Sequence, residues 1–292
     1  MQNLWNQEVE RSFFEKSMQG FAAPEQLFYL TDDDRFLAYW PKGYKGKKST
    51  LQSRNSLIGQ FTETWINELI QDCVKGQNLY AVQGAVCQEI ELTRQSRADV
   101  VIAQKKSVDL NPEDILVIFE VKMSVVWNWE LRNDELICLG DYKTHQGNPG
   151  LLRSDSMLKA IGKAINIRVS SPRASTIPII VIGNTPITDS YMGKVDHLKI
   201  AGITQGFWSI NPRPLDQQNT LNTTDGKGFI KFDTYESLQR SVVEMLSMPM
   251  NFFSGMKNTE ELGKLIESAN NASTYQQKGE RFLNLLQDGK YE

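Results

Sequence analysis

The chain has 292 residues, of which 40% are hydrophobic and 23% are charged, and its formal net charge is −3. This composition indicates a globular protein with a sizeable core and excludes disordered, collagen-like and fibrous proteins. No apolar run approaches the roughly 18 residues of a membrane span, and the first residues contain neither a basic start nor an apolar stretch. We therefore expect no membrane association and no signal peptide.

Cysteine and histidine are too sparse for several common chemistries. The three cysteines, Cys73, Cys87 and Cys138, are far apart and odd in number, which excludes a disulfide framework and a Cys-rich zinc module. The two histidines, His145 and His197, nearly exclude sites that need several imidazoles. The cysteine pattern favours the reducing cytoplasm.

Hydrophobic periodicity predicts mixed helices and strands along the chain. We expect helices over 5–18, 56–75, 155–168, 189–201 and 234–247, with a last helix within 258–287. Strands are expected over 35–40, 79–92, 98–103, 114–126, 176–186, 207–212 and 228–232, and a long polar loop over 132–154. In helix 155–168, Met157, Leu158, Ile161 and Ile165 are expected to point inward, with Lys159, Lys163 and Asn166 on the opposite face. The order helix, three strands, helix, strand predicts an α/β fold with a mixed sheet.

Two basic segments interrupt this mildly acidic chain. Residues 42–54 contain Lys42, Lys45, Lys47, Lys48 and Arg54 without an acid, and 153–173 contain five basic residues against Asp155 alone. Such segments suit a local polyanion site, although an ordinary solvated surface also explains the charge. The first segment superficially resembles a phosphate-binding loop. Pro41 stands where that motif needs its first glycine, and Lys48 follows Gly46-Lys47, so we expect no nucleotide cofactor.

The strand 114–126 carries an unusual pair of charges. Its side chains alternate between two faces, and one face begins with Leu116 and Ile118 before it presents Glu120 and Lys122. A charge pair at the end of a buried strand is costly unless it is paired, hydrated or bound to a metal. An ordinary ion pair at the rim of the sheet would explain this strand by itself.

A second carboxylate begins the preceding strand, at Asp99. If the two strands are neighbours, Asp99 and Glu120 meet at one end of the sheet. Two carboxylates and a backbone carbonyl are hard oxygen ligands of the kind that Mg²⁺ favours, with waters and phosphate oxygens completing the shell. A lysine beside such a metal can hold the attacking water. A turn residue at the start of a strand is the alternative interpretation of Asp99.

The chain resembles the PD-(D/E)XK nuclease superfamily in the spacing of its charged residues. Asp99 is followed by twenty intervening residues and then by Glu120-Val121-Lys122 in a buried strand. The resemblance covers residues 55–210, which it makes a restriction-endonuclease-like core of order α-βββ-α-β. It implies that Asp99, Glu120 and the carbonyl of Val121 bind Mg²⁺, that Lys122 is the catalytic lysine, and that Glu63 is an auxiliary acid on the first core helix. Ala98 stands where many members have proline.

Within that superfamily the chain is most similar to type II restriction endonucleases, which cut double-stranded DNA at defined sequences. Residues 1–54, with the basic loop, and 211–292 would then be extensions packed on the core. The expected DNA-binding residues are Lys42, Lys45, Lys47, Lys48, Arg54, Asn128, Lys143, Arg153, Lys159 and Lys163. Two alternatives remain open: a repair or recombination nuclease of the same superfamily, and a non-catalytic DNA-binding protein on this fold.

The same resemblance predicts a homodimer. One Asp99–Glu120–Lys122 set cuts one strand, so two chains related by a two-fold axis would supply both cuts of a duplex. The expected dimer surfaces are residues 1–40 and 211–292. An apolar-rich stretch within the second could either form that surface or pack in the core: Leu238, Val242, Met245, Leu246, Met248, Met250, Phe252 and Phe253.

Overall fold

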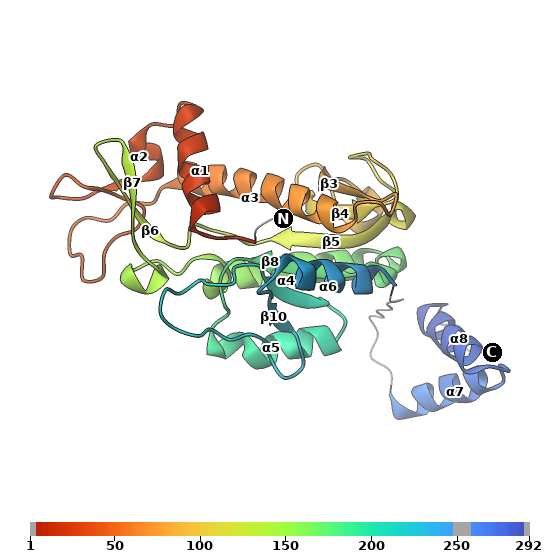
Figure 1. Cartoon of the computed structure of the whole chain (residues 1–292). Coiled ribbons are helices and arrows are strands. Elements are labelled where there is room, and N and C mark those ends of the chain that lie inside the picture. The colour runs from red at the N-terminus through yellow and green to blue at the C-terminus, as the bar shows by residue number, and fades with distance from the viewer. Residues whose placement is uncertain (1–3, 248–257, 289–292) are drawn as a thin grey trace.

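The computed structural model describes residues 4–247 and 258–288 and has a central six-stranded sheet of order β10-β9-β8-β5-β4-β3 (Figure 1). Three of its strands form an antiparallel meander: β3 (Tyr80–Ala85), β4 (Ala98–Ala103) and β5 (Ile115–Val121). The other three run parallel to β5 and to one another: β8 (Ile179–Gly183), β9 (Gly206–Ser209) and β10 (Phe229–Lys231). The expected α/β class with a mixed central sheet is confirmed.

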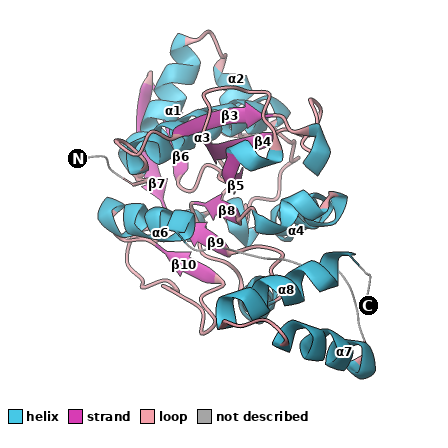
Figure 2. Ribbon diagram, turned by 90° about the vertical axis from the view of Figure 1, so that its right-hand side faces the viewer, coloured by secondary structure: helices cyan, strands magenta, loops and turns pink. Residues whose placement is uncertain are grey.

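Helices cover both faces of this sheet because successive side chains of its strands are apolar on both sides. On one face, Val100, Phe119 and Ile180 pack with the buried residues of α3 (Gln52–Cys73) and α6 (Tyr235–Ser247). On the other face, Val101 and Ile118 pack with α4 (Ser154–Ser170), and β8–β10 pack with α4 and α5 (Asp189–Ile200). Figure 2 shows α6 and α4 on opposite sides of β8 and β9.

The expected polar loop over 132–154 is wrong in its first part, because it contains a strand of a second sheet. This sheet has the order β1-β2-β6-β7 and joins β1 (Tyr29–Leu30) and β2 (Phe36–Leu37) to the hairpin of β6 (Asn128–Arg132) and β7 (Glu135–Gly140). Asn133 and Asp134 both have positive φ, as a two-residue hairpin turn requires. The buried carboxylate of Glu130 accepts from Arg35 at 2.9 and 3.1 Å, so β6 is tied to the N-terminal segment.

The C-terminal part differs from expectation in two ways. Two helices, α7 (Thr259–Asn270) and α8 (Tyr275–Asp288), replace the single helix expected within 258–287, and they pack against each other. Leu238 and Val242 of α6 are fully buried in the core. At these two positions the apolar stretch therefore packs in the core and does not form a dimer surface. Met248, Met250, Phe252 and Phe253 lie outside the described residues. No helix in the described ranges is long and apolar enough to cross a membrane.

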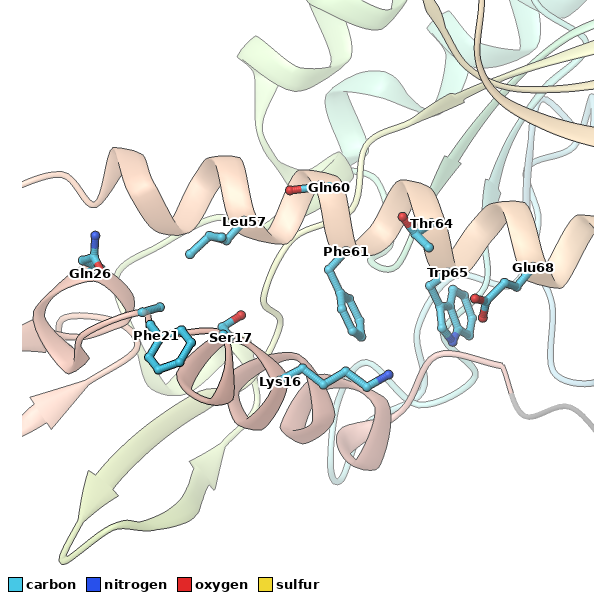
Figure 3. A pocket seen from close by; sticks show the side chains of 12 residues that line it. Lys16, Ser17, Phe21, Gln26, Leu57, Gln60, Phe61, Thr64, Trp65 and Glu68 are labelled. Atoms are coloured by element: carbon cyan, nitrogen blue, oxygen red, sulfur yellow. The ribbon is translucent and has the colours of Figure 1, made fainter. Parts of the chain in front are cut away.

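The first helix, α1 (Gln7–Gln19), is followed by the short α2 (Pro24–Leu27), and both pack near the N-terminal half of α3. A groove of about 560 Å³ runs between α1 and α3, with Phe61 and Trp65 of α3 facing Lys16 of α1 across it (Figure 3). On its other side α1 buries the carboxylate of Glu10, which accepts from the backbone N–H groups of Val126 at 2.8 Å and Trp127 at 2.9 Å. Glu10 thereby fixes the chain just beyond β5.

Burial raises the pKa of Glu10 from 4.5 to about 7, although four hydrogen bonds to its carboxylate oppose the shift. Between these values the unfolded chain releases the proton before the folded protein does, so the free energy of unfolding falls as pH rises and levels off above pH 7. One pKa unit corresponds to about 1.4 kcal/mol, so the free energy of unfolding should fall by about 3 kcal/mol as Glu10 loses its proton. We expect this fall to be absent in Glu10→Gln.

Urea unfolding of the wild type and the variant at pH 4.5 and pH 8 measures this difference. The control is Glu8→Gln, an exposed glutamate on the same helix, which should retain the wild-type pH dependence. An unchanged pH dependence in Glu10→Gln would show that Glu10 does not titrate as described.

Candidate active site

The two carboxylates expected from the sequence meet on one face of the sheet. β4 and β5 are antiparallel with Val100 opposite Phe119, so the next pair in this register is Asp99 and Glu120. Because Val100 and Phe119 face α3, the alternation of side chains places Asp99 and Glu120 on the face that α4 covers. Asp99 Oδ2 also accepts from the backbone N–H of Val121 at 2.7 Å, which fixes the aspartate against β5.

Lys122 joins this pair from the same strand. Its Nζ lies 2.5 Å from Glu120 Oε1 and 3.8 Å from Asp99 Oδ2, and it donates to the carbonyl of Val121 at 3.2 Å. The side chain retains 20% of its exposure, so the ammonium group is at the edge of the solvent rather than sealed in the core. The structure therefore brings together the three residues of the D…ExK pattern.

A second lysine, Lys163 of α4, completes the cluster, and this corrects the orientation expected for that helix. The buried residues of α4 include Met157, Ala160 and Ala164, whereas Leu158 is 62% exposed and Ile165 is 40% exposed. The small alanines let α4 approach the sheet. Lys163 Nζ then lies 3.3 Å from Asp99 Oδ1 and 2.5 Å from Glu120 Oε2, and donates to the carbonyl of Arg97 at 2.7 Å.

The charges in the cluster shift one another's protonation. Burial raises the pKa of Glu120, which is 5% exposed, and the nearby charge of Asp99 raises it further, while the two lysines oppose the shift. For Lys163, burial works to lower the pKa, but Asp99 and Glu120 outweigh it and the net direction is upward. The ammonium groups of both lysines lie between two carboxylates that would otherwise repel each other.

Glu63 approaches the cluster from α3, the helix on the opposite face of the sheet. Its carboxylate accepts from Gln83 Nε2 at 3.4 Å. Burial raises its pKa, and the charge of Asp99 adds to this, while the hydrogen bond and the charges of Lys122 and Lys163 oppose it. Glu63 is therefore within electrostatic range of the cluster and does not contact Lys122 or Lys163 directly.

The donor set fits a divalent cation with hard oxygen ligands. Asp99 and Glu120 already share two cationic groups between them, and Glu120 Oε2 is buried without a well-formed hydrogen bond, although Lys163 Nζ is 2.5 Å away. The carbonyl of Val121 lies beside the same lysine, Lys122. No group of three or more His, Cys, Asp or Glu residues suited to a metal occurs in the described part of the chain, so any metal here relies on two carboxylates, a carbonyl and solvent or substrate oxygens.

The remaining expected DNA-binding residues divide into two groups. Seven are exposed: Lys42, Lys45, Lys47, Lys48, Lys143, Arg153 and Lys159. The other two, Asn128 and Arg54, are buried and do not face the solvent. Asn128 accepts from the backbone N–H of Tyr39 at 2.9 Å, and Arg54 donates to the carbonyls of Leu27 and Ala38. These polar groups are engaged in holding the N-terminal segment to the core.

Sequence reasoning also missed a positioning residue. Asn184, which follows β8 and is fully buried, accepts from Ser124 N at 3.2 Å and donates to Ser124 O at 2.7 Å. It fixes the chain two residues beyond Lys122. The available signal was Asn184 directly after a fully apolar strand, because an asparagine side chain there can bond to backbone groups.

Neither the family models, nor the curated proteins, nor the solved structures contain a match to this chain. The candidate site therefore stands on its own geometry: two carboxylates, two ammonium groups and a backbone carbonyl at one end of a mixed sheet.

Proposed function

We propose that this protein is a Mg²⁺-dependent endonuclease of the PD-(D/E)XK type that hydrolyses phosphodiester bonds of double-stranded DNA. The observation that carries the proposal is the meeting of Asp99, Glu120 and Lys122 at adjacent strand ends, as the D…ExK pattern requires. An ion pair that only stabilised the sheet would need neither a second carboxylate nor a second lysine. A restriction-endonuclease-like core and a cytoplasmic enzyme belong to the same proposal.

Each residue of the cluster has a distinct part in this chemistry. Asp99, Glu120 and the carbonyl of Val121 would hold Mg²⁺, which when bound stabilises negative charge on the phosphate and lowers the pKa of a bound water. Lys122, at the solvent edge, orients the attacking water against the phosphate. Lys163 offsets the repulsion between the carboxylates, and Glu63 is close enough for the charge of Asp99 to raise its pKa.

We further propose site-specific cutting of the type II restriction class by a homodimer. The exposed lysines within 42–48, with Arg153 and Lys159, supply phosphate contacts, which position DNA without reading its sequence. One catalytic cluster per chain makes one cut, so a two-fold dimer accounts for cleavage of both strands. A repair or recombination nuclease would use the same cluster on a DNA structure instead of a sequence. The intact set of three residues disfavours a non-catalytic protein.

Incubation of the purified protein with long natural duplex DNA and Mg²⁺ tests this function. We expect discrete fragments that are absent when EDTA replaces the metal, because a sequence-specific enzyme cuts at a limited number of positions. A continuous smear would favour a nuclease without sequence preference, and cutting confined to branched or nicked DNA would favour the repair alternative. Intact DNA under all of these conditions would contradict the nuclease assignment.

A further inference from the structure

The ammonium group of Lys122 lies where three oxygen atoms converge. Its Nζ is 2.5 Å from Glu120 Oε1, 3.2 Å from the carbonyl oxygen of Val121 and 3.8 Å from Asp99 Oδ2. These oxygens come from the same three residues that would hold Mg²⁺ in the proposed nuclease, and Mg²⁺ requires oxygen ligands at about 2.0–2.1 Å. Lys122 Nζ and a metal ion held by these residues would therefore compete for the same space.

Lys163 lies at a similar set of oxygens but is held more closely. Its Nζ contacts the remaining oxygen of each carboxylate, Asp99 Oδ1 at 3.3 Å and Glu120 Oε2 at 2.5 Å, and donates to the carbonyl of Arg97 at 2.7 Å. None of these three distances is longer than 3.3 Å, whereas the longest distance around Lys122 is 3.8 Å. Of the two lysines, Lys122 is therefore the one that an added cation displaces more easily.

The charges of the cluster disfavour an added divalent cation unless one lysine moves away. Two carboxylates and two ammonium groups sum to zero, so Mg²⁺ would leave two excess positive charges in a place where Glu120 is only 5% exposed. Like charges that are about 4 Å apart repel each other even near a protein surface. Movement of one ammonium group into the solvent removes half of the excess. Glu63, which is within electrostatic range of Asp99, offsets part of the rest.

The side chain of Lys122 can make this movement without a change in the main chain. Its backbone N–H donates to the carbonyl of Ile182 at 2.7 Å, which fixes the main chain at the end of β5. The ammonium group stands on a flexible stem of four carbons, and the side chain already retains 20% of its exposure. Rotation of that stem is sufficient to turn the ammonium group from the carboxylates toward the solvent.

From these observations we infer that Lys122 is a displaceable cation, which neutralises Asp99 and Glu120 until a divalent cation binds them and then turns toward the solvent. Lys163 stays at its oxygens and continues to offset the repulsion between the carboxylates. The inference rests on the proposed nuclease function, since it takes the same metal and the same ligands. It adds a form of regulation: Lys122 becomes available to a water or a phosphate only after the metal has bound.

The reactivity of individual lysines tests the inference in the wild-type protein without DNA. The full-length protein is treated with an amine-acylating reagent in Mg²⁺ or in EDTA, and the rate at each lysine is measured by mass spectrometry of its peptides. We expect Lys122 to react about threefold faster in Mg²⁺, the ratio of the 70% exposure of Lys159 to the 20% exposure of Lys122. Lys163 should keep its low rate, and Lys159, which pairs with Asp155 outside the cluster, should keep its high rate.

Three results would overturn the inference. The first is an unchanged rate at Lys122 under conditions in which calorimetry shows that Mg²⁺ binds. The second is faster acylation of Lys163 in place of Lys122, which would show that the metal displaces the other lysine. The third is the absence of Mg²⁺ binding to the protein.

The affinity for Mg²⁺ provides a second measurement. Isothermal titration calorimetry with Mg²⁺ alone should show that Lys122→Met binds the metal about tenfold more tightly than the wild type, because no ammonium group then has to leave the carboxylates. Lys159→Met is the control and should bind Mg²⁺ as the wild type does. Equal affinities of Lys122→Met and the wild type would show that Lys122 does not compete with the metal. The acylation result does not depend on how the variant folds.

The two proposals fail in different ways. Faster acylation of Lys122 in Mg²⁺, in a protein that never cuts DNA, would refute the nuclease and retain the displaceable lysine. Mg²⁺-dependent cutting by a protein in which bound Mg²⁺ leaves the reactivity of Lys122 unchanged would refute the displaceable lysine and retain the nuclease.

Discussion

Replacement of Glu120 by Gln, or of Asp99 by Asn, is expected to lower the rate of Mg²⁺-dependent cleavage by about a thousandfold or more. Each change removes one of two carboxylates that would hold the metal. A metal contributes several kcal/mol to charge stabilisation in the transition state, and about 4 kcal/mol corresponds to a thousandfold in rate. DNA binding should survive, because the exposed lysines and Arg153 that we propose contact phosphates are unchanged.

The measurement is a single-turnover cleavage rate on a duplex that the wild type cuts, with thermal unfolding to verify the fold. Glu89→Gln is the matched control, since Glu89 is a half-exposed glutamate that pairs with Arg173 away from the cluster. It should cut at the wild-type rate. Wild-type rates in Asp99→Asn or Glu120→Gln would remove the metal site from the mechanism.

Variants of the two lysines in the cluster should distinguish an effect on the cleavage step from an effect on DNA affinity. Lys122→Met is expected to lower the single-turnover rate about a hundredfold or more with little change in DNA affinity, because a residue that acts only in the chemical step reduces the rate and not the binding. Lys163→Met should also lower the rate, since Lys163 Nζ lies 3.3 Å from Asp99 and 2.5 Å from Glu120. The loss should be smaller, because the proposed mechanism assigns the attacking water to Lys122 and only charge compensation to Lys163.

Lys159→Met is the matched control for both lysine variants. Lys159 lies one turn before Lys163 on α4, is 70% exposed and pairs with Asp155 at 3.0 Å. Its loss should leave the single-turnover rate unchanged and at most weaken DNA binding. Normal cutting by Lys122→Met would show that its pairing with Glu120 is structural.

The sequence predicts the part of the site that lies on strands. Asp99 and the Glu120-Val121-Lys122 segment are each embedded in apolar runs, so their strands, their pairing and their shared face follow from alternation. The orientation of α4 does not follow in the same way. Leu158 and Ile165 looked like its core face, but the sheet accepts the smaller Ala160 and Ala164, and a 3.6-residue period alone does not say which of two apolar stripes faces inward.

The burial of two charged residues could not be predicted, because their partners are far away in the sequence. Nothing near Glu130 in the sequence predicts its burial, yet Glu130 is buried because Arg35, 95 positions earlier in the chain, neutralises it. Arg54 looked like a phosphate ligand for the same reason, since its carbonyl acceptors belong to segments that are distant in sequence. A charged residue can be assigned to the interior only when its partner is known, and local sequence does not identify that partner.

The buried carboxylate of Glu10 bears on whether the proposed nuclease core could fold as a separate fragment. A fragment of residues 55–210 would contain Asp99, Glu120 and Lys122 but would lack α1 and β2. The N–H groups of Val126, Trp127 and the Trp129 indole would then lose their shared acceptor, and β6 would lose the strand beside it. Trp127 and Trp129, which pack in one cluster with Phe13 and Phe14 of α1, would also lose that apolar cover and face water. The boundary of the sequence motif is therefore not a boundary of autonomous folding.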